Sequence, residues 1–92
     1  MEENQKIRSL VASGRLNEAL EKLDEAIAAG GDSDGSMHFM RGKLHWRMGN
    51  RSAAMCDYAA ALEINPDHKA AAMALAQARD IAAFFNPDLY NP

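Results

Sequence analysis

The side chains most often used in catalysis or metal binding are few in this sequence and poorly spaced for either task. His38 and His45 lie seven residues apart, about 10 Å along a helix axis, which is too far to share one metal ion comfortably. Cys56 is the only cysteine and has no CxxC partner. Because free cysteines are usually small core residues, we expect Cys56 to be buried.

Four acidic residues close together offer the other conceivable chemistry, general acid catalysis. They face away from the apolar side of the same predicted helix, as a solvated outer surface does. The four acids are Glu18, Glu21, Asp24 and Glu25, and the apolar side is Leu16, Leu20, Leu23 and Ile27. The chain also lacks a glycine motif of the Walker or dinucleotide type. The sequence therefore predicts a protein that is not an enzyme and has no cofactor and no metal.

Composition limits the fold to one small helical domain. The chain has 92 residues, and 48% of them are hydrophobic, with alanine prominent and β-branched residues scarce. Alanine favours helices that pack closely together, whereas sheets favour β-branched side chains. The sequence predicts an all-α fold.

Charge and hydropathy bear on partners and location. The formal net charge of -3 argues against nucleic acid, since phosphate neutralisation needs an excess of Lys and Arg. No apolar run approaches the roughly 20 residues of a membrane span, and "MEENQKIRSL" lacks the apolar region of a signal peptide. With a single cysteine, a reducing compartment is the simplest expectation. We expect a cytoplasmic protein with neither a nucleic-acid nor a membrane partner.

The pattern that must position any functional residue is an internal repeat. The stretch "GNRSAAMCDYAAALEINP" from Gly49 to Pro66 has a counterpart 35 residues earlier, beginning at Gly14. In both copies a large residue stands between two small ones on one helical face. These triads are Ala19, Leu23 and Ala26 in the first copy, and Ala54, Tyr58 and Ala61 in the second. Small positions at fixed spacing predict that a second helix crosses closely there.

Each copy is preceded by another helical pattern that ends at a glycine, so each unit is predicted to be a helical hairpin. The predicted divisions are a first hairpin at 1–29, a second at 34–65, a capping helix at 67–85 and a tail at 86–92. Ser33 and Asp34 are candidate N-caps for the second hairpin. Leu89 and Tyr90 in the tail are candidates to fold back on the last hairpin.

These residues resemble the tetratricopeptide repeat (TPR), whose pattern is W-x2-L-G-x2-Y, then A-x3-F, then P. Gly42 takes the glycine position, Ala54 and Tyr58 the A-x3-F positions, and Pro66 the closing proline. His38, Arg41 and His45 depart from the pattern at the W, L and Y positions, and we expect the two histidines to have satisfied interior roles. The resemblance covers about two and a half repeats and implies a short right-handed superhelix of stacked hairpins.

The resemblance also implies a binding surface. In TPR arrays the first helices of successive hairpins line a concave groove. The matching positions here are Asn4, Arg8, Phe39, Lys43, Trp46, Arg47, Met73 and Gln77. Aromatic side chains flanked by cations suit a protein or peptide partner, in particular an acidic segment. A few TPR domains hold the C-terminal carboxylate of a peptide in a clamp of Lys, Asn and Arg side chains. A complete clamp of this kind is not expected here, because Met40 and Ala74 stand where the family has polar residues.

Two alternatives stay open on sequence grounds. Phe39 and Trp46 either face the groove or pack against the last helix, whose alanines leave room for large rings. The protein either binds a partner segment without catalysis, or self-associates as a homo-oligomer or assembly subunit through its exposed apolar ends.

Overall fold

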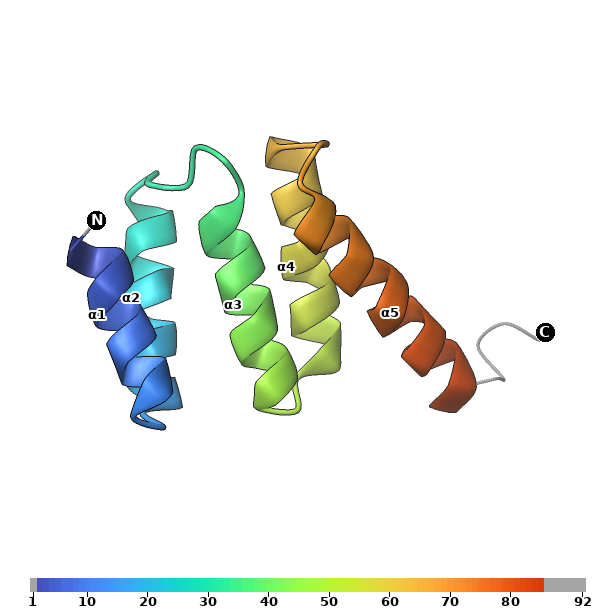
Figure 1. Cartoon of the computed structure of the whole chain (residues 1–92), viewed down its shortest axis with the longest axis horizontal. Helices are drawn as coiled ribbons and strands as arrows, with labels where there is room; N and C mark the ends of the chain where they lie inside the picture. The colour runs from blue at the N-terminus through green and yellow to red at the C-terminus, as the bar shows by residue number, and fades with distance from the viewer. Residues whose placement is uncertain (1, 86–92) are drawn as a thin grey trace.

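The fold consists of helices joined by short connections (Figure 1). The computed structural model describes the backbone of residues 2–85 and the side chains of residues 5–82. Its helices are α1 (Glu2–Ala12), α2 (Leu16–Ala28), α3 (Ser36–Arg47), α4 (Arg51–Ile64) and α5 (Lys69–Phe85). The predicted all-α fold is confirmed. The predicted contact of Leu89 and Tyr90 lies outside the described residues.

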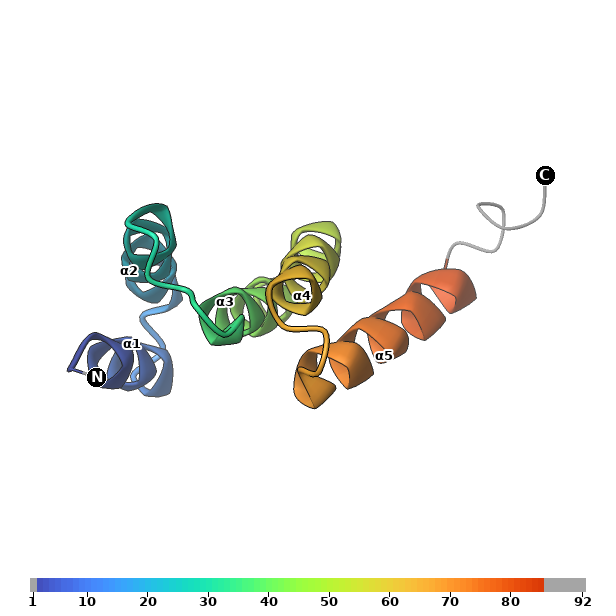
Figure 2. The same ribbon diagram turned by 90° about the horizontal axis from the view of Figure 1, so that it is seen from above.

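The helices form two layers. Seen from above, α1, α3 and α5 lie along one side of the molecule, while α2 and α4 lie along the other (Figure 2). Helix α3 packs against both α2 and α4, and α5 packs against α4. Antiparallel hairpins therefore stack side by side, an arrangement consistent with the predicted superhelix.

The hydrogen bonds of the two hairpin turns recur with the 35-residue period of the sequence. The N–H of Arg15 donates to the carbonyl of Leu10, and the N–H of Asn50 donates to that of His45, both at 2.8 Å. Gly14 and Gly49 lie inside these turns with φ of 80° and 88°, a region that glycine enters without a Cβ penalty. The repeat is thus a repeat of backbone geometry as well as of residue types.

The small-large-small triads are buried in both copies, as the spacing predicts. Ala19, Leu23 and Ala26 are 0%, 0% and 6% exposed in α2, and Ala54, Tyr58 and Ala61 are 0%, 4% and 0% exposed in α4. These side chains sort into two apolar clusters. The first joins α1, α2 and α3 around Ile7, Leu23 and Leu44, and the second joins α3, α4 and α5 around Tyr58, Leu75 and Ala78. Because α3 contributes to both, it connects the two halves of the stack.

The two hairpins fill their helix crossings in opposite ways. In the first hairpin, Ile7 on α1 and Leu23 on α2 are both fully buried. At the matching positions of the second hairpin stand Gly42 and the larger Tyr58. A Cβ at Gly42 would lie only 2.6 Å from Cε1 of Tyr58 and 3.1 Å from the carbonyl oxygen of Ala54. The ring of Tyr58 therefore takes the volume that a side chain on α3 would need.

The start of α3 is capped mainly by Asp32, which was not among the predicted candidates. Gly35 occupies the N-cap position and has no side chain to offer. Asp32 reaches forward instead, accepting hydrogen bonds from the N–H groups of Met37 at 3.2 Å and His38 at 2.9 Å. Asp34 accepts from the N–H of Ser36, so it has part of the predicted role. The prediction for Ser33 was wrong, because the loop brings Asp32 to the helix end.

Asp32 makes the stability of α3 sensitive to acid. Burial of this carboxyl raises its pKa, but hydrogen bonds from the His38 ring and from two N–H groups outweigh burial and hold the pKa below its ordinary 3.8. A lowered folded-state pKa means that the stabilisation is complete above about pH 4 and is lost as the pH falls through the folded value. We expect Asp32→Asn to cost about 1 kcal/mol at pH 7 and to flatten the loss of stability below pH 4. Thermal melts at several pH values measure both effects. Asp67→Asn, at an exposed turn position, should change neither.

The predicted position of Cys56 was wrong. Its side chain is exposed on α4. The buried side of α4 is instead formed by Ala54, Tyr58 and Ala61, with Asp57 beside them. Cys56 is two residues from Ala54, and a two-residue step on a helix turns the side chain about 200° away from that side. The acidic residues of α2 are exposed as predicted.

Candidate functional site

A hollow of about 590 Å³ lies between α1 and α3, on the side formed by the first helices of the two hairpins. Three of its lining residues, Arg8, Lys43 and Arg47, are cations with exposed side chains, and none is acidic. The rest of the lining is largely apolar: Val11, Ala12, Ser36, Phe39, Met40 and Leu44. This one hollow is thus lined by four of the predicted site residues: Arg8, Phe39, Lys43 and Arg47.

A smaller hollow of about 210 Å³ lies between α3 and α5. Its lining includes four predicted site residues, Phe39, Lys43, Trp46 and Gln77. Tyr58, Ala74, Ala78 and Ile81 complete it. Because Phe39 and Lys43 line both hollows, they lie on the ridge between them.

The two aromatic rings on α3 are half-buried, and a cationic side chain lies over each ring. Phe39 packs against the rings of Tyr58 and His68, with ring centroids 5.8 Å and 5.0 Å away. The Nζ atom of Lys43 lies 5.6 Å from the Phe39 centroid, and the guanidinium of Arg51 lies 5.2 Å from the Trp46 centroid. Both rings also pack against the apolar cluster that includes Leu75 and Ala78 of α5. The two sequence interpretations therefore combine, since each ring supports the α5 side of the core and also lines a hollow.

Among the predicted site residues whose side chains are described, Met73 does not join the others. Met73 is 65% exposed on α5 and is not among the residues that line either hollow. The side chain of Asn4 lies outside the described residues. The candidate site is therefore centred on α3, with Arg8 added from α1 and Gln77 from α5.

A polar layer that the sequence reading missed joins α2, α3 and α4. Arg41 donates two hydrogen bonds to Asp57, from Nε to Oδ2 at 2.9 Å and from Nη2 to Oδ1 at 2.8 Å. A third goes from Nη1 to Oδ1 of Asp24, also at 2.9 Å. Asp57 is only 5% exposed, and its hydrogen bonds help to raise the pKa of Arg41 further, so the guanidinium stays charged. The sequence did contain a signal for this layer, because helical periodicity places Asp57 on the same side of α4 as the small residues Ala54 and Ala61.

The two histidines of α3 have the interior positions predicted for them. Besides the hydrogen-bonded Arg41, the His45 Nε2 atom lies 3.8 Å from Oδ2 of Asp57, and the His38 ring contacts Asp32. The two histidine side chains are 16% and 17% exposed. Nδ1 of His45 is buried without a hydrogen-bond partner among the described residues. Arg41 and His45 thus link α3 to α4, whereas His38 contacts the loop before α3, and none of the three lines the hollows.

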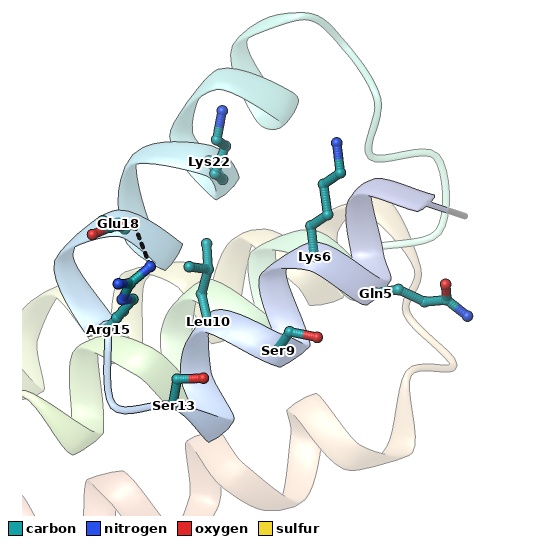
Figure 3. Close-up of a pocket in the computed structure, with 8 residues that line it drawn as sticks. All are labelled: Gln5, Lys6, Ser9, Leu10, Ser13, Arg15, Glu18 and Lys22. Carbon is teal, nitrogen blue, oxygen red and sulfur yellow. Dashed lines mark ion pairs between the residues drawn. The ribbon is translucent and has the colours of Figure 1, made fainter.

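A third hollow, of about 740 Å³, lies between α1 and α2 at the N-terminal end of the stack (Figure 3). Lys6, Arg15 and Lys22 line it, but acids lie beside two of them. Nη1 of Arg15 is 3.9 Å from Glu18, and Nζ of Lys22 is 4.0 Å from Glu25. No predicted site residue lies there. Its cations are thus partly neutralised, unlike those of the hollow between α1 and α3.

Neither a metal-binding cluster nor a membrane-spanning helix lies in the described part of the chain. No group of three or more His, Cys, Asp or Glu side chains there is arranged to hold a metal ion. None of the helices found between residues 2 and 85 combines the length and apolar character that crossing a membrane requires. The hollow between α1 and α3 has a largely apolar lining with three exposed cations.

Comparison with known proteins gave one match. Residues 35–68 match the family model described as tetratricopeptide repeat. The match begins just before α3 and ends just after Pro66, so it covers the second hairpin and its closing turn. No curated protein and no solved structure matched the chain.

Proposed function

We propose that this chain, a repeat protein of the TPR type, is a non-catalytic interaction module whose concave side holds an acidic segment of a partner protein. TPR repeats generally mediate protein-protein interaction. The acidic character of the bound segment is the part of the proposal that depends on the surface of this chain. The observation that carries it is the hollow between α1 and α3, which has three exposed cations, an apolar floor and no acid in its lining. We also propose a cytoplasmic location, where a lone exposed thiol such as Cys56 stays reduced.

The partner chemistry follows from the positions of the charges. Lys43 lies over the Phe39 ring, between the two hollows, while Arg8 and Arg47 belong to the hollow between α1 and α3 only. A segment with an apolar anchor over Met40 and Leu44 would place acidic groups within reach of these cations. Guanidinium groups can bind carboxylates through two parallel hydrogen bonds, which adds orientation to charge attraction. An acidic, amphipathic peptide therefore matches this surface better than a basic or wholly apolar one.

The cations give a cleaner test than the rings. Phe39 and Trp46 support the core around Tyr58 and Leu75, so their removal would change stability and binding together. Lys43 and Arg47 are exposed, and substitutions there should leave the fold intact.

The test is a selection from a random peptide library displayed on phage, with the purified chain as bait. We expect enrichment of peptides that combine Asp or Glu with an apolar anchor. For a synthetic copy of an enriched peptide, Lys43→Glu/Arg47→Glu should weaken binding by about 10- to 100-fold, and added salt should weaken binding to the wild type. Isothermal titration calorimetry measures both.

Lys6→Glu/Lys22→Glu is the matched control, because it makes the same charge change in the hollow between α1 and α2. It should bind the peptide within a few-fold of the wild type. Equal losses in both double variants would reduce the effect to net charge, and no enrichment of acidic sequences would count against the proposed partner.

A further inference from the structure

Four residues of α5 form a stripe on the side away from the core. Lys69, Met73, Ala76 and Asp80 are spaced by four, three and four residues, so they fall within an arc of about 60° on the helix. All four are exposed, and Met73, at 65%, is the most exposed large apolar side chain in the described part of the chain. The buried residues of α5, Ala71, Leu75 and Ala78, lie on the other side of the helix.

The corresponding side of α3 is covered by a following helix. Arg41 and His45, which stand 35 residues before Ala76 and Asp80, both reach Asp57 on α4. Helix α5 is the last of the described helices, and none of the others lies along its outer side (Figures 1 and 2). The stripe therefore lacks, among the described residues, the helix that α4 provides for α3.

We propose that this stripe pairs with the same stripe of a second copy of the chain, with the two α5 helices antiparallel. The sequence of the stripe is self-complementary in that orientation. A two-fold axis between Met73 and Ala76 places each Met73 against Ala76 of the partner subunit, a large residue against a small one. The same axis places each Lys69 against Asp80 of the partner subunit, so two ion pairs form at the ends of the contact.

The local structure supports a second copy as the occupant. No ion pair found among the described side chains includes Lys69 or Asp80. The spacing of four, three and four residues is that of a coiled-coil seam, in which two helices keep contact along their length. A parallel pairing would place Lys69 against Lys69 and Asp80 against Asp80, so charge selects the antiparallel orientation.

The contact between the two α5 helices is small. One helix pair covers less than the roughly 800 Å² per partner that is typical of a stable complex. The dimer is therefore weak, with a dissociation constant of about 0.1 to 1 mM. It forms on a different surface from the hollow between α1 and α3, so it does not depend on the proposed peptide binding.

The test uses charge reversal and mixing. Sedimentation equilibrium of the wild type, from about 10 µM to about 2 mM, should show an average mass that rises from 10.1 kDa toward twice that value. Lys69→Glu alone and Asp80→Lys alone should each remain monomeric, because each places like charges together at both ends. An equimolar mixture of the two variants should dimerise, since both ion pairs form again between unlike copies.

Lys22→Glu on α2 is the control and should dimerise as the wild type does. A wild type that stays near 10.1 kDa at every concentration would overturn the proposal. So would single variants that dimerise normally, or a mixture that stays monomeric. Peptide binding should be unchanged in Lys69→Glu. The proposed dimer and the proposed peptide binding in the hollow between α1 and α3 can therefore fail separately.

Discussion

Gly42→Ile is expected to destabilise the protein by about 3 kcal/mol, at the upper end of the usual cost of overfilling a core. The new side chain would have to occupy the position of the Tyr58 ring, whose Cε1 atom is 2.6 Å from a Cβ built on Gly42. Tyr58 is 4% exposed and is packed against Leu75 and Ala78, so a displaced ring would lose contacts in that cluster. Urea denaturation followed by circular dichroism measures the change.

A second substitution tests the reason. The first hairpin has Ile7 and Leu23 where the second has Gly42 and Tyr58, and both of the former are fully buried. Gly42→Ile/Tyr58→Leu copies that solution into the second hairpin, so the double variant should recover at least half of the lost stability. A double variant whose loss equals the sum of the two single losses would show that the two positions do not share one volume.

Arg41→Met is expected to cost about 3 kcal/mol, because it leaves the Asp57 carboxylate buried without its main partner. The remaining neighbour, Nε2 of His45, is 3.8 Å away and would be a poor replacement. The loss should appear as a lower midpoint in urea denaturation with little change in slope.

Two comparisons isolate the buried contact. Asp24→Asn alters the contact of Arg41 with a carboxylate that is 54% exposed, so it should cost less than about 1 kcal/mol. Arg41→Met/Asp57→Leu removes both charges and should be more stable than Arg41→Met alone. If Arg41→Met cost no more than Asp24→Asn, the polar layer would contribute little to the stability of the fold.

Local signals were enough for the helices and their turns. Gly14 and Gly49 end the first helix of each hairpin, and the recurrence of Ala19 and Ala54 indicated two crossings of the same kind. Such features depend on residues close in sequence, through backbone conformation and helical periodicity. The predicted surface residues on α3 follow from the same periodicity, and Phe39, Lys43, Trp46 and Arg47 do line hollows.

The errors at Ser33 and Cys56 are local, but the contacts on which the prediction was silent are distant in sequence. The pairing of Arg41 with Asp57 depends on the rotation of α4 against α3, and the half-buried state of Phe39 depends on where α5 crosses both. The exposure of Met73 likewise depends on which side of α5 the core takes.

The sequence by itself determined that this protein is a stack of helical hairpins, because glycine stops and helical periodicity act over a few residues. Only the tertiary structure decided which polar groups are paired inside the stack, which rings also support the core, and which helix face no other described helix covers. Those outcomes depend on helix crossings, where a rotation of one helix by a fraction of a turn exchanges buried side chains for exposed ones.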